Sequence, residues 1–396
     1  MQVTIHPSKC SGTIVAPPSK SMSHRLLICA GLSQGTSHIE NIAFSDDVLA
    51  TIRCLKALGA AVETSQNAVT VTGIGGHIAA SDILSCGECG STIRFFTALA
   101  LLSDDPITLT GSPRLLQRPM TVYENICLEQ NLLFDKNDNA LTVCGKLSSG
   151  KYEIDGSISS QFISGLLFAL PLLPQDSTIV LTGHIESRPY IDMTIDALVS
   201  FGVKAEWHSQ NEITISGGQC YQAQNVTVEG DWSNAAFFLS LGEDVQLTGL
   251  RDDSLQGDKV CREYFAQLCN DTPTLDISDC PDLGPILFAY AAAHHGGTFT
   301  GTARLRIKES DRAAAMQAEL AKLGVRLTET DNTVTIESAQ LCQPNEQIEC
   351  HNDHRIAMAM ATLLLQTGGT LTGAECVNKS LPDFFERLKK LKANIE

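Results

Sequence analysis

The order of apolar and polar positions contains a sequence repeat that recurs along the chain about every 50 to 70 residues. Each copy opens with a short strand of alternating apolar and polar residues that ends in Thr-Gly or a close equivalent. An irregular loop, an amphipathic helix and a pair of alternating strands follow, so one copy predicts the order strand, helix, strand, strand. We count six copies, and their opening strands begin at Thr36, Ile107, Ile179, Val245, Thr298 and Thr370.

The predicted helices of three copies end at a glycine. Gly59, Gly202 and Gly324 each follow an amphipathic run and suit the position just past a helix, where the backbone turns left-handed. Six such units are too large for a solenoid and too many for one layer. The pattern therefore predicts a mixed α/β fold of α+β type, with two lobes that each contain three strand-helix-strand-strand units.

A hinge between the lobes is predicted near Gly230, where a strand is followed by a Gly-Asp turn and by Ser233 as a helix cap. The pair Pro17 and Pro18 forms a second stiff connector, because proline continues neither a helix nor a strand ladder. We therefore expect a C-terminal lobe of residues 1–18 and 230–396, and an N-terminal lobe of residues 19–229.

Acidic residues outnumber basic ones, since the 396 residues include 28 Lys and Arg against 45 Asp and Glu, a net charge of −17. A field of this sign repels nucleic acid and anionic membranes, and we expect neither as a partner. The sequence shows no apolar run that would span a membrane and no signal peptide at its start. We therefore expect a cytoplasmic monomer that acts on small molecules.

Fourteen cysteines are scattered along the chain and form one C-x-x-C pair, Cys86 and Cys89. Neither a zinc ribbon nor a disulfide framework has its usual spacing here, so we expect reduced thiols. The pair would hold a metal if two more ligands lay nearby, or act as a redox dithiol if it were exposed at a helix start. We favour neither, and we expect no metal and no cofactor.

The scarce cations gather in loops that precede predicted helices. Lys20 and Arg25 open an apolar helix with Ser19 or Ser21 as its cap, next to free backbone N–H groups and the positive helix end. A second loop, around Gly90, repeats this design, and its glycines allow close approach of the backbone. Such helix starts bind anions. Arg94 belongs to the second loop, and similar places hold Arg118, Ser159, Ser160, Gln161, Arg304, Lys308, Glu309, Arg312, Arg355 and Lys379.

Each motif also has an ordinary structural interpretation. A single cation in such a loop is more often a solvated side chain or part of a helix-end ion pair. The ion pairs would then lie along one exposed helix and involve Lys308, Glu309, Asp311 and Arg312. His351 and His354 would be hydrogen-bonded loop histidines rather than a metal site. Recurrence at successive helix starts favours a site: if the lobes face each other, these starts converge on one cleft that binds a small polyanion.

Two segments are characteristic of one family. Residues 305–312 read Leu-Arg-Ile-Lys-Glu-Ser-Asp-Arg, and residues 353–358 read Asp-His-Arg-Ile-Ala-Met. Together with the segments around Lys20 and Lys379, they make the chain resemble the 5-enolpyruvylshikimate-3-phosphate synthases over nearly its whole length. The resemblance implies two lobes of three repeated units with the active site in the cleft between them. It also implies transfer of the enolpyruvyl group of phosphoenolpyruvate to the 5-hydroxyl of shikimate 3-phosphate, with release of phosphate, in the shikimate pathway to aromatic amino acids.

Both substrates implied by the resemblance carry one phosphate and one carboxylate, so they need dense positive charge. By similarity, Lys20 contacts both of them. The residues implied to bind shikimate 3-phosphate are Lys20, Ser21, Arg25, Ser159, Ser160, Ser187, Asp282 and Lys308. Those implied to bind phosphoenolpyruvate are Lys20, Gly90, Arg94, Arg118, Gln161, Arg312, Arg355 and Lys379.

The resemblance also implies the chemistry, an addition and elimination through a tetrahedral intermediate. Asp282 matches the family's base for the hydroxyl. Lys308 and Glu309 are the candidates for the acid that protonates the methylene carbon, because crowded charges shift pKa values. Lys20 completes this catalytic set, and the sequence leaves open which of the two candidates delivers the proton.

Two positions depart from the family's common pattern. Glu88 stands where asparagine is frequent, which we expect to weaken phosphate binding unless a cation pairs with it, and Arg304 adds positive charge where asparagine is also common. Two rival functions are the sister enolpyruvyl transferase that acts on UDP-N-acetylglucosamine and a catalytically silent homologue that binds an organic phosphate. The sister enzyme typically carries a reactive cysteine in the loop that matches residues 111–118, where this chain has none. The retained acid and base candidates, such as Asp282, speak against a silent homologue.

Overall fold

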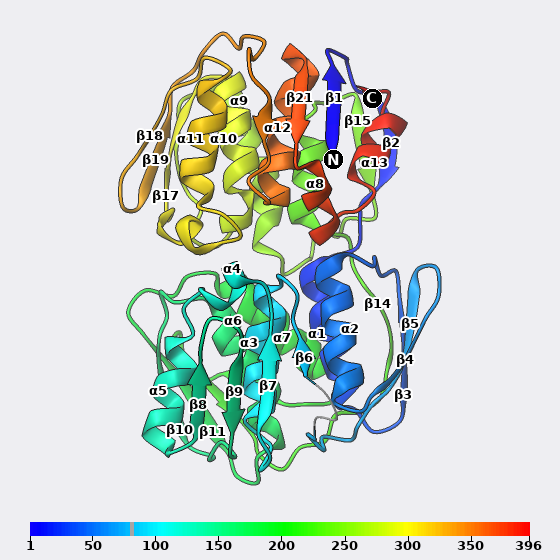
Figure 1. The fold of residues 1–396 in the computed structure, drawn as a ribbon, viewed down its shortest axis with the longest axis vertical. Helices are drawn as coiled ribbons and strands as arrows, with labels where there is room; N and C mark the ends of the chain where they lie inside the picture. The colour runs from blue at the N-terminus through cyan, green and yellow to red at the C-terminus, as the bar shows by residue number, and fades with distance from the viewer. Residues whose placement is uncertain (80–82) are drawn as a thin grey trace. The chain divides into compact units, whose positions relative to one another are not determined.

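The structure, a computed structural model, describes residues 1–79 and 83–396 of the chain. Contacts divide the described residues into two compact units (Figure 1). Pro18–Glu229 form one of them, which we call the central unit, and Met1–Pro17 with Gly230–Glu396 form the other, which we call the terminal unit. Each unit is described by itself.

Three sheets of one common strand order belong to the described part of the central unit. In each of them the first strand of the sheet order runs parallel to the second, which is the opening strand of the repeat. The opening strand pairs antiparallel with the third strand, and the third and fourth strands form a hairpin. The sheets are β14-β3-β5-β4 (Asn225–Thr227, Thr36–Glu40, Ala68–Thr72, Ala61–Thr64), β6-β7-β9-β8 (Leu84–Ser85, Ile107–Thr110, Leu141–Cys144, Leu133–Lys136) and β10-β11-β13-β12 (Lys151–Asp155, Ser177–Thr182, Glu212–Ile215, Ala205–Trp207).

Almost every residue of helices α1, α3 and α6 in the central unit is buried. A helix that is apolar on all sides belongs in the interior of a unit. Its side chains and the inner faces of the sheets form one continuous core, and the sheets flank the helices in Figure 1. The helices are α1 (Lys20–Leu32), α2 (Asp46–Ala57), α3 (Gly90–Ala100), α4 (Pro113–Leu116), α5 (Thr121–Gln130), α6 (Ser160–Ala169) and α7 (Arg188–Ser200), with the 3₁₀ helix η1 (Leu170–Leu172).

Both ends of the chain contribute strands to the terminal unit. Strand β1 pairs antiparallel with β21 and β22, and β2 runs parallel to β15. The register of β1 joins Gln2 to Thr372, so segments from opposite ends of the sequence share one sheet. The sheets are β16-β17-β19-β18 (Thr274–Asp276, Gly297–Thr300, Thr333–Ile336, Leu327–Glu329), β20-β21-β1-β22 (Ile348–Glu349, Gly369–Thr372, Gln2–His6, Asn394–Ile395) and β15-β2 (Val245–Thr248, Gly12–Val15).

Helices α10 and α12 contribute long buried runs to the core of the terminal unit. Among the described residues, no helix combines the length and the apolar composition that crossing a membrane requires. The helices are α8 (Trp232–Leu239), α9 (Cys261–Asn270), α10 (Gly284–Ala293), α11 (Arg312–Ala321), α12 (His354–Thr367) and α13 (Phe384–Lys390), with the 3₁₀ helices η2 (Gly257–Val260), η3 (Pro281–Leu283), η4 (Ala303–Ile307) and η5 (Ala374–Lys379).

The predicted repeat and the mixed α/β fold class are confirmed, since β3, β7, β11, β15, β17 and β21 start within two residues of the predicted opening strands. Gly59, Gly202 and Gly324 have the left-handed φ values of +99°, +78° and +83° that were predicted for helix ends. Three details were wrong. Each four-stranded sheet contains one additional strand, parallel to the opening strand, that the sequence repeat did not predict. The opening strand of the fourth copy, β15, pairs with β2 instead of with a hairpin of its own copy. Ser233 lies inside α8, whose cap is the Asp231 carboxylate.

Candidate active site

The predicted site residues lie mostly at the starts of helices, and they form one charged cluster in each unit. In the central unit they begin α1, α3 and α6 or directly precede α7. In the terminal unit they lie just before α10 or around the starts of α11 and α12, except Lys379, which ends η5. We call the group around Lys20 the central cluster (Lys20, Arg25, Gly90, Arg94, Arg118, Ser159, Gln161). The group around Asp282, to which the structure adds Asp353, is the terminal cluster (Asp282, Lys308, Glu309, Arg312, Asp353, Arg355, Lys379).

Lys20 is the first residue of α1. The hydroxyl of Ser19 caps this helix by accepting a hydrogen bond from the backbone N–H of Met22 at 3.3 Å. The Lys20 ammonium donates to the Asp47 carboxylate, with 2.8 Å between Nζ and Oδ2, and its side chain is 14% exposed. The cap confirms that the sequence marks a helix start here, and the ion pair fixes the ammonium next to the positive end of the helix.

Arg25 lies one turn further along α1 and is 3% exposed. Its Nε donates to the Thr194 hydroxyl at 2.9 Å, Nη1 to the Ser21 carbonyl at 2.7 Å and Nη2 to the Tyr190 carbonyl at 2.8 Å. Burial lowers the pKa of this guanidinium to about 10. Two of these bonds join α1 to α7, the third stays within α1, and Nη2 also lies 3.5 Å from the Ser164 hydroxyl of α6. These bonds leave fewer N–H groups for a ligand than the sequence alone suggested.

The glycine-rich loop around Gly90 leads into α3, whose start also belongs to the central cluster. Arg94 Nη1 donates to Gln161 Oε1 at 2.6 Å, and Gln161 Nε2 donates to the Ser91 hydroxyl at 2.8 Å. A β-carbon on Gly90 would lie 2.4 Å from Nη1 of Arg118, closer than any real contact. Four residues of the predicted phosphoenolpyruvate set thus meet at one place, and the missing side chain of Gly90 makes room for the guanidinium of Arg118.

The three predicted phosphate-binding serines are buried. Ser159 caps α6 and also accepts a hydrogen bond from Arg94 Nη1 at 3.4 Å, so its capping role and its place in the central cluster coexist. Ser160 is the first residue of α6. Ser187 precedes α7 with φ of +58°, a left-handed conformation that is uncommon outside glycine and concentrates at functional sites.

Asp282 lies at the centre of the terminal cluster. Its Oδ1 accepts from Lys308 Nζ at 3.2 Å and from Arg312 Nη1 at 3.0 Å, while Oδ2 accepts from Arg355 Nη2 at 3.0 Å. Three cations therefore hold this carboxylate in place at the centre of the cluster, next to Lys308, the candidate acid.

Arg312 holds three carboxylates and is 1% exposed. Besides Asp282, it binds Asp353 through Nε at 2.9 Å and Nη2 at 3.3 Å, and Glu309 through Nη2 at 2.7 Å. Burial by itself lowers the pKa of this guanidinium, but Asp353, Glu309 and Asp282 together raise it above its usual value. The ordinary interpretation of this segment is confirmed for the ion pair between Glu309 and Arg312 but wrong about an exposed helix, because Lys308 and Glu309 precede α11 and Arg312 is buried.

Lys308 ends the 3₁₀ turn that precedes α11. Its pKa is lowered to about 8, mainly by burial and further by the charges of Arg304 and Arg312, while Asp282 acts in the opposite direction. A group with a pKa near neutrality is suited to proton transfer.

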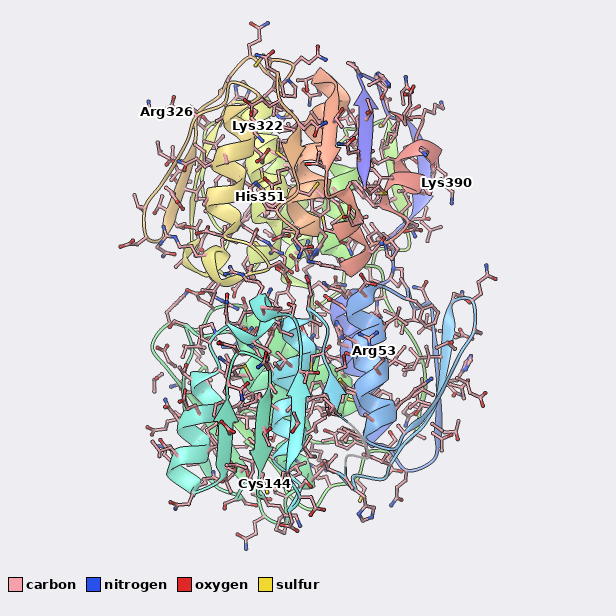
Figure 2. All side chains as sticks on the ribbon, in the orientation of Figure 1. Arg53, Cys144, Lys322, Arg326, His351 and Lys390 are labelled. Atoms are coloured by element: carbon pink, nitrogen blue, oxygen red, sulfur yellow. The ribbon has the colours of Figure 1, made fainter. Side chains whose placement is uncertain are left out.

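Lys379 donates to the backbone carbonyl of Asn352, with 2.6 Å between Nζ and the oxygen, and so lies beside the loop that leads into α12. In that loop His351 Nε2 contacts Glu319 Oε1 at 2.8 Å, and Lys322 Nζ donates to Oε2 of the same carboxylate at 2.7 Å. His351 and Lys322 are labelled in Figure 2. His351 is thus a hydrogen-bonded loop histidine, as its ordinary interpretation had it, whereas that interpretation was wrong for His354, which is the first residue of α12.

The sequence analysis missed two carboxylates that hold predicted cations. Asp47 pairs with Lys20, and Asp353 pairs with Arg312. Both occupy helix starts, Asp47 in the first turn of α2 and Asp353 as the cap of α12. Acidic residues at a helix start were a visible signal, but they predict a cap or a dipole contact rather than a distant ion-pair partner.

The two departures from the family's pattern lie in different units. Glu88 is half-buried in the glycine-rich loop of the central unit. Arg304 is nearly buried in the terminal unit, where its charge acts on Lys308.

All fourteen cysteines are free thiols. In the C-x-x-C pair, the Cys86 thiol donates to the Leu84 carbonyl at 3.5 Å, whereas Cys89 caps α3 and lies 3.9 Å from His24 Nε2. The two sulfurs therefore have separate surroundings, and both are buried. A redox dithiol exposed at a helix start is excluded for this pair.

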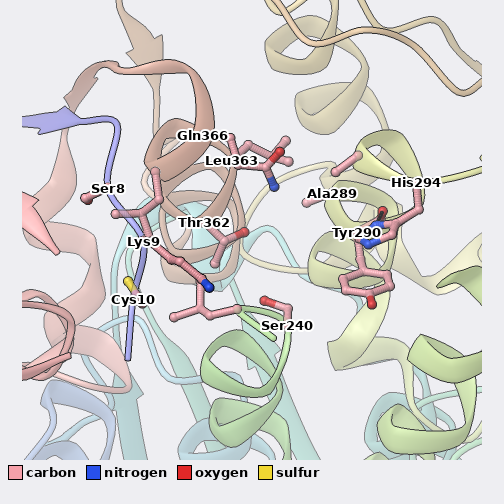
Figure 3. Close-up of a pocket in the computed structure, with 13 residues that line it drawn as sticks. Ser8, Lys9, Cys10, Ser240, Ala289, Tyr290, His294, Thr362, Leu363 and Gln366 are labelled. Carbon is pink, nitrogen blue, oxygen red and sulfur yellow. Dashed lines mark hydrogen bonds between the residues drawn. The ribbon is translucent and has the colours of Figure 1, made fainter. Parts of the chain in front are cut away.

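A cavity of about 300 Å³ lies in the terminal unit, between the loop that follows β1 and the last turns of α8, α10 and α12 (Figure 3). Predicted site residues do not line it. Thr362 is the first residue of α12 that reaches the cavity, about 10 Å along the helix from Arg355. The lining residues are Ser8, Lys9, Cys10, Ser240, Leu241, Ala289, Tyr290, Ala293, His294, Thr362, Leu363, Leu365 and Gln366.

Comparison with known proteins gives one consistent result. The family model described as EPSP synthase (3-phosphoshikimate 1-carboxyvinyltransferase) matches residues 5–388. A protein of Clostridium kluyveri named 3-phosphoshikimate 1-carboxyvinyltransferase is 40% identical over 418 aligned positions, which cover 100% of this chain and 98% of that protein. A protein of the same name from Clostridioides difficile is 38% identical, with 99% and 98% covered. The solved structure of EPSP synthase from Acinetobacter baumannii has the same fold, with a TM-score of 0.81 over 100% of this chain and 99% of that one at 24% identity.

Proposed function

The chain belongs to the EPSP synthase family and transfers the enolpyruvyl group of phosphoenolpyruvate to the 5-hydroxyl of shikimate 3-phosphate, with release of phosphate; we propose that the central and terminal clusters carry out this reaction. The observation that supports this proposal most is where the cations lie. In a chain of net charge −17, buried or nearly buried cations gather at helix starts in both units. Such places suit substrates that each carry a phosphate and a carboxylate.

In this proposal, shikimate 3-phosphate binds mainly to the central unit. The start of α1 and the serines at the starts of α6 and α7 offer hydroxyl and backbone donors. Arg25 rigidifies the site through its bonds to Thr194, Ser21 and Tyr190, and its remaining N–H capacity is available to a ligand. The proposed contacts are Lys20, Ser21, Arg25, Ser159, Ser160 and Ser187, with Asp282 and Lys308 from the terminal unit.

Phosphoenolpyruvate binds to cations from both units in this proposal. Arg94, Arg118 and Gln161 already lie together around Gly90, whose missing side chain lets the Arg118 guanidinium approach the backbone, and this guanidinium is proposed to meet the phosphate there. Arg312 is engaged by three carboxylates, so a substrate carboxylate reaches it only by displacing Glu309 or Asp282. The full proposed set is Lys20, Gly90, Arg94, Arg118, Gln161, Arg312, Arg355 and Lys379.

We propose Asp282 as the base that takes the proton of the 5-hydroxyl and Lys308 as the acid that protonates the methylene carbon. The lowered pKa of Lys308, about 8, leaves this ammonium mostly protonated at neutral pH but more ready to give up its proton than an ordinary lysine. Glu309 is then held by Arg312, which favours a positioning role for it. After addition, the C–O bond to phosphate breaks while a proton of the new methyl group returns to the neutral Lys308 amine, which restores the double bond of the enolpyruvyl group. The cations of both clusters offset the charge of the leaving phosphate.

We further propose that the two units correspond to the two lobes of the family and that the protein works as a cytoplasmic monomer. Fourteen free cysteines support a reducing compartment.

The test is an assay of phosphate release from phosphoenolpyruvate with each of two acceptors. Turnover with shikimate 3-phosphate and none with UDP-N-acetylglucosamine is the expected outcome. Turnover with the UDP-sugar alone would reassign the chain to the sister enzyme. Binding of shikimate 3-phosphate in calorimetry without any turnover would indicate a silent homologue and contradict the proposal.

A further inference from the structure

Three buried side chains with different donor atoms meet in the central unit, beside Lys20. They are His24 within α1, Asp47 in the first turn of α2 and Cys89 as the cap of α3, and their exposures are 1%, 8% and 2%. One donor atom from each, an imidazole nitrogen, a carboxylate oxygen and a sulfur, lie within 4.8 Å of one another. We propose that this His–Asp–Cys cluster binds a thiophilic divalent cation, such as Zn²⁺ or Cd²⁺, and that the bound cation inhibits the enzyme.

The spacing of the donors suits one shared ion. With Zn–S of about 2.3 Å and Zn–N of about 2.0 Å, tetrahedral coordination places sulfur and nitrogen about 3.5 Å apart. His24 Nε2 and Cys89 Sγ are 3.9 Å apart, so these two donors need to move by only a few tenths of an ångström, and the Asp47 carboxylate, within 4.8 Å of both, completes the site by a larger side-chain movement. An imidazole, a thiolate and a carboxylate are all established zinc ligands, and the fourth position remains for water or a ligand oxygen.

A second observation, independent of the cluster itself, concerns the orientation of the imidazole. His24 Nδ1 is hydrogen-bonded to the Thr51 hydroxyl at 2.8 Å, and Thr51 is bonded in turn to the Thr92 hydroxyl at 2.9 Å. These two hydrogen bonds hold the imidazole ring so that Nε2 points toward Cys89. Histidines that bind metal ions almost always have the other ring nitrogen fixed in this manner.

The charges of such a complex balance. The Cys89 thiol gives up its proton to the solvent as the metal–sulfur bond forms, and no electron is transferred. The resulting thiolate and the Asp47 carboxylate together offset the two positive charges of the ion, while the imidazole stays neutral. The sulfur makes the site selective for thiophilic ions over Mg²⁺ and Ca²⁺, which prefer oxygen ligands.

Inhibition follows from the ion pair between Lys20 and Asp47, whose Nζ and Oδ2 are 2.8 Å apart. A cation bound to the Asp47 carboxylate competes with the Lys20 ammonium and repels it. Lys20 is proposed to contact both substrates, so this part of the inference rests on the proposed function. The metal site itself does not depend on it.

The experiment uses the full-length chain in which the exposed thiols are removed by the changes Cys220→Ser, Cys269→Ser and Cys342→Ser. Cd²⁺ is titrated after treatment with a chelator, and the thiolate-to-metal absorption in the ultraviolet reports binding. The test variant is Cys89→Ser, which keeps a good helix cap. The matched control is Cys29→Ala, which removes another buried cysteine of the same unit. Thr51→Val is a second variant that leaves all three ligands in place.

We expect one saturable Cd²⁺ site in the parent and in Cys29→Ala, with an affinity at least about tenfold lower in Cys89→Ser and in Thr51→Val. Equal affinity in the parent and Cys89→Ser would overturn the proposal. In the second arm, Zn²⁺ inhibits turnover of the parent and its half-inhibitory concentration rises at least about tenfold in Cys89→Ser. Metal binding without inhibition would overturn the second part of the proposal, the competition between the metal ion and Lys20. Cd²⁺ binding by a parent that does not turn over shikimate 3-phosphate would count against the proposed function alone.

Discussion

The two charged clusters have different chemical surroundings, although both lie at helix starts. In the terminal cluster, Asp282, Glu309 and Asp353 lie directly on the guanidinium of Arg312. In the central cluster, the donors of Arg25 and Arg94 go to neutral oxygens of hydroxyl, carbonyl and amide groups. Neutral partners orient a guanidinium without cancelling its charge, while carboxylates cancel it.

This difference suggests a division of labour. A site that binds two doubly charged anions needs positive charge that its neighbours do not cancel. In the central cluster Arg25 keeps such a charge, whereas the Lys20 ammonium is paired with the Asp47 carboxylate. A site that moves protons needs an ionised carboxylate and an ammonium with a lowered pKa, which the terminal cluster supplies in Asp282 and Lys308. We therefore expect changes in the terminal cluster to affect turnover and stability, and changes in the central cluster to affect mainly the affinity for substrates.

The largest effect is expected for Asp282→Ala. Removal of the proposed base should lower kcat by about a hundredfold to ten-thousandfold. Binding of shikimate 3-phosphate, measured by calorimetry, should persist because most of its proposed contacts lie in the central unit. Asp279→Ala, an exposed acid three positions away, is the control and should retain full turnover. Unchanged turnover in Asp282→Ala would remove this residue from the mechanism.

The second effect concerns stability and compares the carboxylates that the sequence analysis missed. Asp353→Asn breaks a buried ion pair with Arg312 and should lower the free energy of unfolding of the terminal unit by about 3 kcal/mol. Asp47→Asn should cost the central unit only about 1 kcal/mol, because Lys20 retains some solvent.

The two tryptophans allow each unit to be followed alone. Trp207 lies in β12 of the central unit and Trp232 in α8 of the terminal unit, and the chain has two tryptophans in total. Urea unfolding followed by fluorescence, with Trp207→Phe or Trp232→Phe as the background, reports one unit at a time. Equal losses for the two variants would contradict the contrast between the clusters.

The repeat, the helix starts and the cations at them could be predicted from the sequence because each has a local signal. Alternating residues predict a strand, and Ser19 before an apolar run predicts a cap. The partners of those cations had no local signal. Asp282 and Arg355 are 73 positions apart, and Arg25 and Thr194 are 169 apart. The pairing of β1 with β21 across almost the whole chain was equally invisible, because a short alternating strand has many compatible partners.

The third prediction tests the space beside Gly90. In Gly90→Ala the new methyl group would displace the guanidinium of Arg118, the flexible end of a side chain, so stability should change little. The KM for phosphoenolpyruvate should rise about tenfold or more, because a displaced cation no longer meets its anion. The KM for shikimate 3-phosphate should stay within about twofold if the two sets of contacts are separate.

Glyphosate, which in this family occupies the position of phosphoenolpyruvate, should lose affinity in parallel in Gly90→Ala. Glyphosate inhibition that stays undiminished in this variant would contradict the placement of phosphoenolpyruvate against Gly90.

The smallest effect, a shift of a pH profile, decides which residue is the acid. If Lys308 donates the proton, it must be protonated to act, so kcat/KM should fall as the pH rises through its pKa of about 8. The charge of Arg304 contributes to lowering that pKa, and Arg304→Asn should therefore raise it. The basic limb of the profile should move upward by less than about one pH unit. Arg306→Asn is the control, because its guanidinium binds Glu329 and the Thr330 carbonyl instead. If the basic limb stays at the same pH in Arg304→Asn, Lys308 does not donate the proton. Glu309, the other candidate, then becomes the proposed acid, because the pH profile would not follow the pKa of Lys308.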